Sequence, residues 1–126
     1  MSAIDLPAVD APELSAHAEH EGDALTLRLS GTADMRVSEA LERVLTRVHE
    51  EAQRLAVARV RVDLCALEFM NSSCLKSFVT WISQDRDLAP ERRYAIHFIS
   101  RPEILWQRRS LHALRCFAVD LITVEG

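Results

Sequence analysis

The residues best able to do chemistry are two serines and a cysteine that follow one another at positions 72–74. A cysteine at the start of a helix can have a lowered pKa and act as a nucleophile, with a histidine as its base. The candidate pair is Cys74 and His97, but His97 lies between two apolar residues of a predicted strand. Because nothing in the sequence brings these two side chains together, we expect no catalytic residue and no enzymatic activity.

Metal and cofactor chemistry is not indicated either. His17 and His20 are three residues apart on a predicted strand, so their side chains face opposite sides of it. No set of cysteines and histidines has the spacing of a zinc site. Lys76, the only lysine, lacks the glycine-rich frame of a phosphate-binding loop. We expect no metal and no cofactor, and we expect His49 and His112 to lie at the solvent.

The composition limits the class of protein. The chain has 126 residues, 48% of them hydrophobic and 27% charged, which is typical of one globular domain. A net charge of −4 argues against a dedicated nucleic-acid binder, because such domains are normally basic. No apolar stretch reaches the roughly 18 residues of a membrane span, and the N-terminus shows no secretory signal. The three cysteines form no Cys-x-x-Cys pair, and we expect reduced thiols in a cytoplasmic protein.

Periodicity in the sequence predicts the elements that position these residues. Leu25, Leu27 and Leu29 alternate with polar residues, as in a strand with one buried face. Apolar residues recur at three- and four-residue steps over 37–55, which indicates an amphipathic helix. The short polar side chains at 71–73 can cap a helix, so a second helix is predicted over 72–87. Further strands are expected near 16–20, 57–64, 94–99 and 118–124, and a third helix near 102–114.

Strands that alternate with helices predict a small α/β domain with a largely parallel sheet. The first strand would be an antiparallel addition to that sheet, paired with the second strand as a hairpin. Residues 1–14 carry Pro7 and Pro12 among small and acidic residues, and we expect them to be a flexible leader. The folded domain is then expected to span residues 15–126.

The segment between the strand at 57–64 and the following helix contains Phe69-Met70-Asn71-Ser72-Ser73-Cys74-Leu75. It resembles the signature loop of the STAS family, the domains of anti-sigma factor antagonists, which typically reads apolar-x-Asp-Ser-Ser/Thr-Gly-Leu. Asn71 stands in place of the family Asp, and Cys74 stands in place of the family Gly. Two further segments resemble the family as well, Leu29-Ser30-Gly31-Thr32-Ala33-Asp34 and Val62-Asp63-Leu64.

The resemblance implies a single STAS-like domain, with a mostly parallel five-stranded sheet and its helices packed on one face. It also implies a non-enzymatic switch or adaptor that binds a protein partner, such as a serine kinase or anti-sigma factor, through residues 69–82. In the family the first serine of the signature pair is phosphorylated, and the matching residue is Ser72.

Two alternatives stay open at this point. Ser72 and Ser73 could only cap the helix. The chain could also be a scaffold or constitutive subunit that is never phosphorylated and that self-associates. Asn71, Cys74 and the lack of the family's last helix in this sequence favour this second role, whereas the retained Ser72-Ser73 pair favours the switch.

The residues around the loop are candidate contacts for the partner. If Leu75, Phe78, Val79 and Ile82 face the core, one flank of that helix carries Cys74, Ser77 and Trp81. On the third helix two large side chains point away from the expected inner stripe. Each tryptophan could instead pack at the rim of its helix. Because Trp and Arg are enriched at interfaces, the expected partner-binding residues are Met70, Asn71, Ser73, Cys74, Ser77, Trp81, Trp106 and Arg109.

The end of the sequence bears on assembly. STAS domains usually add a helix after the last strand, and this sequence stops at Gly126. Without that helix, apolar surface near 117–124 is expected to be uncovered. Because exposed apolar patches usually find a partner, we expect a homodimer or a tight hetero-complex.

Overall fold

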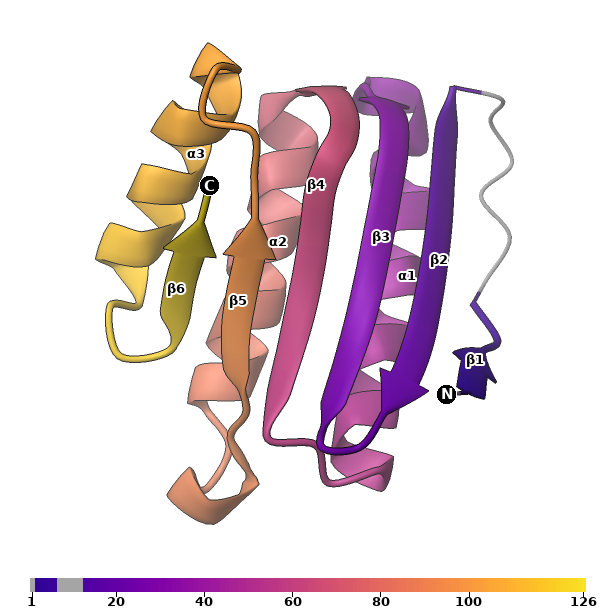
Figure 1. Cartoon of the computed structure of the whole chain (residues 1–126), viewed down its shortest axis with the longest axis vertical. Helices are drawn as coiled ribbons and strands as arrows, with labels where there is room; N and C mark the ends of the chain where they lie inside the picture. The colour runs from indigo at the N-terminus through magenta and orange to yellow at the C-terminus, as the bar shows by residue number, and fades with distance from the viewer. Residues whose placement is uncertain (1, 7–12) are drawn as a thin grey trace.

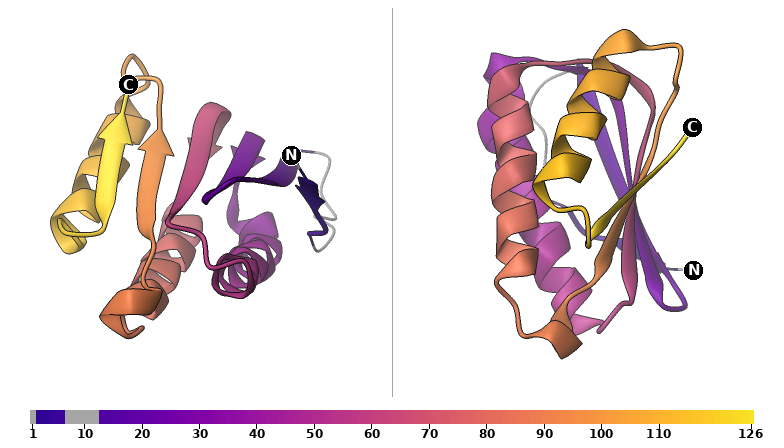
Figure 2. Two further views of the ribbon diagram at one scale, coloured as in Figure 1. Left: turned by 60° about the horizontal axis from the view of Figure 1, so that its bottom comes forward. Right: turned by 90° about the vertical axis from the view of Figure 1, so that its left-hand side faces the viewer.

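The computed structural model describes residues 2–6 and 13–126 of the chain. This part of the chain forms two layers, a six-stranded sheet and three α-helices that cover one of its faces (Figure 1, Figure 2). The strands lie in the sheet in the order in which they occur along the chain. They are β1 (Ser2–Ile4), β2 (Leu14–Glu21), β3 (Ala24–Ala33), β4 (Arg59–Met70), β5 (Ala95–Ile99) and β6 (Ile122–Glu125). The helices are α1 (Ser38–Arg54), α2 (Ser72–Arg86) and α3 (Leu105–Phe117), with 3-10 turns η1 (Met35–Val37) and η2 (Pro90–Arg92).

The pairing of the strands decides where the loops gather. β1 pairs with β2, and β2 with β3, in antiparallel fashion. β3, β4, β5 and β6 are parallel to one another, and a helix connects each to the next. The carboxyl ends of β3, β4 and β5 therefore lie at one end of the molecule, where the three helices begin (Figure 1).

The core lies between the sheet and the helices. The alternating Leu25 and Leu27 of β3 are fully buried there, and so are Val60 and Val62 of β4. α1 buries the stripe that its sequence predicts, because its apolar residues recur on one side of the helix. The predictions of an α/β fold and of helices on one face are thus confirmed.

The sheet has one strand more than the five that we expected. Ser2–Ile4 pairs with β2, where Ala3 lies opposite Glu19, and β2 itself begins at Leu14. The prediction of a flexible leader over 1–14 is therefore wrong for these residues, and positions 7–12 lie outside the described residues. Three residues give too little pattern for a strand to be recognised, because their pairing depends on a distant partner.

Some element boundaries also differ from the predictions. β4 continues six residues beyond Leu64 to Met70, because β3 offers it a partner up to Ala33. α3 begins at Leu105 instead of Pro102, and β6 begins at Ile122 instead of Ala118. The extension of β4 matters most, because it carries the chain to the end of the sheet directly before the Asn71-Ser72-Ser73 segment.

Candidate functional site

The loop between β4 and α2 is held at both ends by hydrogen bonds. The Asn71 backbone N–H donates to the Ala33 carbonyl oxygen at 2.9 Å, which ties the loop to the end of β3. The Asn71 side-chain oxygen accepts from the Cys74 backbone N–H at 3.0 Å, so Asn71 is the N-cap of α2. The predicted helix start is confirmed, but the capping group is Asn71 and not a serine hydroxyl.

Ser72 is the first residue of α2, and its side chain is exposed. The backbone N–H groups of the first helical turn have no carbonyl acceptor within the helix. The positive end of the helix dipole lies at the same place. A phosphate on Ser72 would therefore meet hydrogen-bond donors and a favourable field, and α2 would not have to unfold.

Cys74 does not have the environment of a nucleophile. Its side chain is fully buried beneath α2, and its thiol lies 3.5 Å from the Asp34 carbonyl oxygen. Burial, with a smaller contribution from the charge of Asp34, raises the pKa of the Cys74 thiol to about 11. His97 lies on the other face of the sheet, where it bonds Thr123, so the two side chains cannot act together. His112 is exposed, as expected.

The neighbouring loop, between β3 and α1, is organised by charged groups. Asp34 accepts a hydrogen bond from the Arg36 backbone N–H at 2.9 Å and so caps η1. The Arg36 guanidinium lies 2.7 Å from the Asp34 carboxylate and 3.0 Å from that of Glu13. Its hydrogen bond to Asp34 holds the pKa of this carboxyl below its usual range.

Three exposed apolar side chains surround this end of the sheet. Met35 is 71% exposed in the β3–α1 loop, Phe69 is 46% exposed at the end of β4, and Leu105 is 50% exposed at the start of α3. α3 is tied to β4 here, because the Trp106 indole N–H donates to the Glu68 carbonyl oxygen at 2.7 Å. We call Ser72 with Met35, Phe69 and Leu105 the strand-end surface. The carboxyl ends of β3, β4 and β5 lie toward the top of Figure 1.

The structure corrects the predicted position of Trp81. This side chain is only 1% exposed, and its indole N–H donates to the Tyr94 hydroxyl at 2.8 Å. Leu75 and Val79, expected to be central, are only partly buried. The prediction that Trp81 lies on an outward flank is wrong, because the inner stripe of α2 is turned relative to the expected one. This stripe consists of Cys74, Phe78, Trp81, Ile82 and Asp85.

The remaining predicted contacts differ in accessibility. Met70 and Cys74 are buried, so their prediction as partner contacts is wrong, whereas Asn71, Ser73 and Ser77 are half-buried. On α3, Trp106 is half-buried and packs against the core at the rim of its helix, whereas Arg109 is exposed.

Sequence analysis missed Met35, Phe69 and Leu105. Phe69 could have been found by extending the alternation of Val60, Val62 and Leu64, which places residue 70 inward and Phe69 outward. Two register shifts between β3 and β4 leave Leu67 as the only buried residue of β4 that is out of step with this period. Met35 and Leu105 carry no such signal, because single apolar residues in loops are common.

Among residues 2–6 and 13–126, no group of three His, Cys, Asp or Glu side chains is placed to hold a metal ion. Within the same residues, no helix is long and apolar enough to cross a membrane.

The comparisons with known proteins concern the fold. No protein-family model matches the sequence, and no curated protein matches it. Solved structures do match. An anti-sigma factor antagonist from Mycobacterium paratuberculosis has a TM-score of 0.68 at 20% identity, over 92% of this chain and 89% of that chain. The anti-sigma factor antagonist SpoIIAA in its unphosphorylated form has a TM-score of 0.59 at 16% identity, over 89% of each chain.

A third similar structure is a protein of the DUF3478 family from Shewanella loihica, which has a SpoIIAA-like fold. Its TM-score is 0.57 at 11% identity, over 95% of this chain and 91% of that chain. The chain therefore has the SpoIIAA-like fold.

Proposed function

We propose that this chain is a non-enzymatic regulatory switch or adaptor that binds a protein partner through the strand-end surface. The observation that carries the proposal is an exposed serine, Ser72, at the start of α2, at the same end of the sheet as the exposed side chains of Met35, Phe69 and Leu105. Apolar side chains supply binding energy at protein interfaces, and a serine among them supplies a place for control. The fold that the chain shares with anti-sigma factor antagonists supports this regulatory role.

Phosphorylation of Ser72 is the proposed control. A phosphate would add about −1.5 to −2 charges at neutral pH to a surface that exposes the apolar side chains of Met35, Phe69 and Leu105. α2 would tolerate that charge, because it lies at the positive end of the helix dipole. A partner that covers Met35, Phe69 and Leu105 would have to bury the same charge, and its affinity would fall. Phosphorylation would thus change binding and leave the fold intact.

The partner that fits this scheme best is a serine kinase that also acts as an anti-sigma factor. Such a protein would bind the unmodified strand-end surface and release it after transferring a phosphate to Ser72. We place this function in the cytoplasm, where the free thiols of Cys65, Cys74 and Cys116 would stay reduced.

A second candidate is a constitutive subunit that is never phosphorylated and that self-associates. The observation in its favour is the exposed apolar surface near β6, where Val119 is 72% exposed and Val124 partly exposed. Phe117 is exposed too, although the Arg86 guanidinium lies 4.5 Å from the centre of its ring. In the described part of the chain, β6 pairs only with β5 and leaves one strand edge free. Such an edge can pair with another copy.

The test compares three variants in their binding to the partner recovered from the native cell. Ser72→Asp should weaken binding by at least about tenfold, because it places a carboxylate in the interface. Ser72→Ala should bind like the wild type and keep its stability within about 0.5 kcal/mol, since Ser72 is exposed and does not cap the helix. Thr80→Asp is the matched control, because it adds the same charge at an exposed position of the same helix.

Phosphopeptide mass spectrometry of the natively isolated protein should find the phosphate on Ser72. If Ser72→Asp binds as tightly as Thr80→Asp, the strand-end surface is not the switch. A chain that carries no phosphate in any growth condition, and that sediments as a dimer, would support the constitutive subunit instead.

A further inference from the structure

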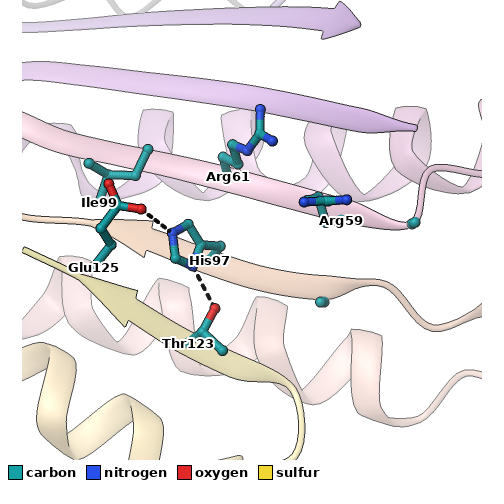
Figure 3. A pocket seen from close by; sticks show the side chains of 8 residues that line it. Arg59, Arg61, His97, Ile99, Thr123 and Glu125 are labelled. Carbon is teal, nitrogen blue, oxygen red and sulfur yellow. Dashed lines mark hydrogen bonds and ion pairs between the residues drawn. The ribbon is translucent and has the colours of Figure 1, made fainter. Parts of the chain in front are cut away.

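The face of the sheet that the helices leave open carries a shallow groove of about 680 Å³. This volume lies within the range of about 300–1,000 Å³ found for small-molecule sites. Parallel strands are normally covered on both faces, so a parallel sheet with a bare face is unusual. The groove crosses β4, β5 and β6 (Figure 3), and it is lined by Ala58, Arg59, Arg61, Ala95, His97, Ile99, Thr123 and Glu125.

Of the two arginines that line the groove, Arg61 is the one that forms no ion pair among the described residues, whereas Arg59 pairs with Asp23. Arg61 lies between Thr26 of β3 and His97 of β5 in the strand register, and its side chain is half-buried. Within the described residues, no carboxylate forms an ion pair with Arg61. Glu125 is engaged elsewhere, because its carboxylate lies 3.1 Å from the His97 Nε2 atom. Figure 3 shows the Arg61 guanidinium pointing away from that pair.

Another arginine on the same face shows that pairing is possible there. The Arg28 guanidinium lies 3.4 Å from the Glu19 carboxylate and 3.8 Å from that of Asp63. Arg28 thus has two carboxylates from neighbouring strands, whereas Arg61 has a threonine and a histidine beside it. The charge of Arg61 is therefore not explained by the internal pairing of this face.

Arg59 adds a second guanidinium to the same end of the groove. It is two residues from Arg61 on β4, so both side chains lie on the open face. Its ion pair with Asp23 is long, at 3.6 Å, and the Asp23 side chain is mostly exposed. Hydrogen-bond donors of Arg59 therefore remain free for a ligand, because a guanidinium has five.

From this arrangement we propose that the groove binds the phosphate group of a small organic phosphate. Two guanidinium groups match the charge of a phosphate monoester, and their planar forks suit its oxygens. Ala58, Ala95 and Ile99 give the rest of the ligand an apolar wall. Glu125 at the other end of the groove would repel a second anionic group, so the remainder of the ligand is uncharged. This site is separate from the strand-end surface and does not depend on the role of Ser72.

The test uses phenyl phosphate as the probe, followed by amide chemical shifts of the isotope-labelled full chain. We expect saturable shifts in β4, β5 and β6 with the wild type. Arg61→Gln, which keeps most of the side-chain stem, should bind about tenfold more weakly because a charge-assisted hydrogen bond is lost. Arg28→Gln is the matched control, since it removes an arginine that is already paired on the same face, and it should bind like the wild type.

Three results would overturn the proposal. The first is a wild type that shows no saturable shift at millimolar probe. The second is an equal loss of affinity in Arg61→Gln and Arg28→Gln, which would indicate a general effect of net charge. The third is inorganic phosphate binding as tightly as phenyl phosphate, since the organic part would then make no contact. The amide spectrum of each variant shows directly whether it is folded, and Arg61→Lys, which keeps the charge, serves as the replacement should Arg61→Gln not fold.

Discussion

Replacing Asp85 by Asn should make this protein more stable at neutral pH. The Asp85 side chain is fully buried under α2, and one of its carboxylate oxygens accepts from the Tyr94 backbone N–H at 3.1 Å. The other oxygen has no hydrogen-bond partner among the described residues. Burial raises the pKa of Asp85 to about 6, although the Tyr94 N–H and the charge of Arg93 oppose this change.

The size and sign of the effect follow from the two protonation states. A carboxyl whose pKa rises from 3.8 in the unfolded chain to about 6 in the folded one destabilises the folded state by about 3 kcal/mol when ionised. Above pH 6 the carboxyl is charged in both states, and the whole cost is present. Between pH 6 and pH 3.8 the folded state takes up a proton that the unfolded state lacks, so the cost disappears as the pH falls.

The Asn side chain keeps an oxygen for the Tyr94 N–H and removes the charge. Its amide N–H group would stand where the protonated acid has its O–H, and neither finds a partner there. The difference in unfolding free energy between Asp85→Asn and the wild type should therefore be small at pH 4. It should grow to about 3 kcal/mol in favour of the variant at pH 7.5.

Urea denaturation of both proteins at several pH values between 4 and 7.5 measures this difference. Taking the difference removes the contributions of Asp34, Glu51 and Glu103, whose lowered pKa values act in the opposite direction in both proteins. Asp120→Asn is the control, because Asp120 is exposed and its removal should give a nearly flat difference. If the Asp85→Asn difference were equally flat, burial would not have raised this pKa, and the reasoning would be wrong.

Two further predictions follow from local geometry. Iodoacetamide should alkylate the exposed Cys116 in the native protein and spare Cys74, whose pKa is raised to about 11, until the chain unfolds; peptide mass spectrometry detects this. Gly31→Ala should lower the free energy of unfolding by at least about 2 kcal/mol, because Gly31 has a φ of 97° and an added Cβ would lie 1.9 Å from the Glu13 carbonyl oxygen. Gly22→Ala should lower the free energy of unfolding by less, because Gly22 has a φ of 59° and an added Cβ would meet nothing within 4 Å. Denaturant melts of both variants measure the two losses, and a larger loss for Gly22→Ala would contradict the argument.

The fold was predictable where the sequence has a strong period. The alternation of Leu25, Leu27 and Leu29 and the stripe of α1 report burial directly, because one face of each element packs on the core. β1 was not predictable, since three residues have no period and their pairing with β2 depends on the whole sheet. The local sequence pattern thus identified the central strands and helices, whereas the edge strand β1 depends on its pairing with β2.

The candidate site was only partly predictable. A buried polar side chain can be told from an exposed one only by the hydrogen-bond partners that the fold brings to it. Gln107 is fully buried, and its amide donates to the carbonyl oxygens of Leu64 and Leu67. His49, expected at the solvent, is half-buried and bonds the Tyr94 hydroxyl at 2.5 Å. These polar side chains are indistinguishable in the sequence from surface residues. The same applies to Asp85, whose burial helps to fix which side of α2 faces the core.

The burial of Trp81 changes where a partner can bind. With its indole directed to Tyr94 in the core, Trp81 cannot anchor a partner on the flank of α2. The exposed Met35, Phe69 and Leu105 lie instead at or just beyond the carboxyl ends of parallel strands, and Ser72 lies at the same end of the sheet because α2 begins there. In α/β folds these carboxyl ends are where ligands usually bind, since the loops converge and helix N-termini point toward them. An interface at this end of the sheet would therefore bring a partner directly onto Ser72, an exposed serine at the start of α2.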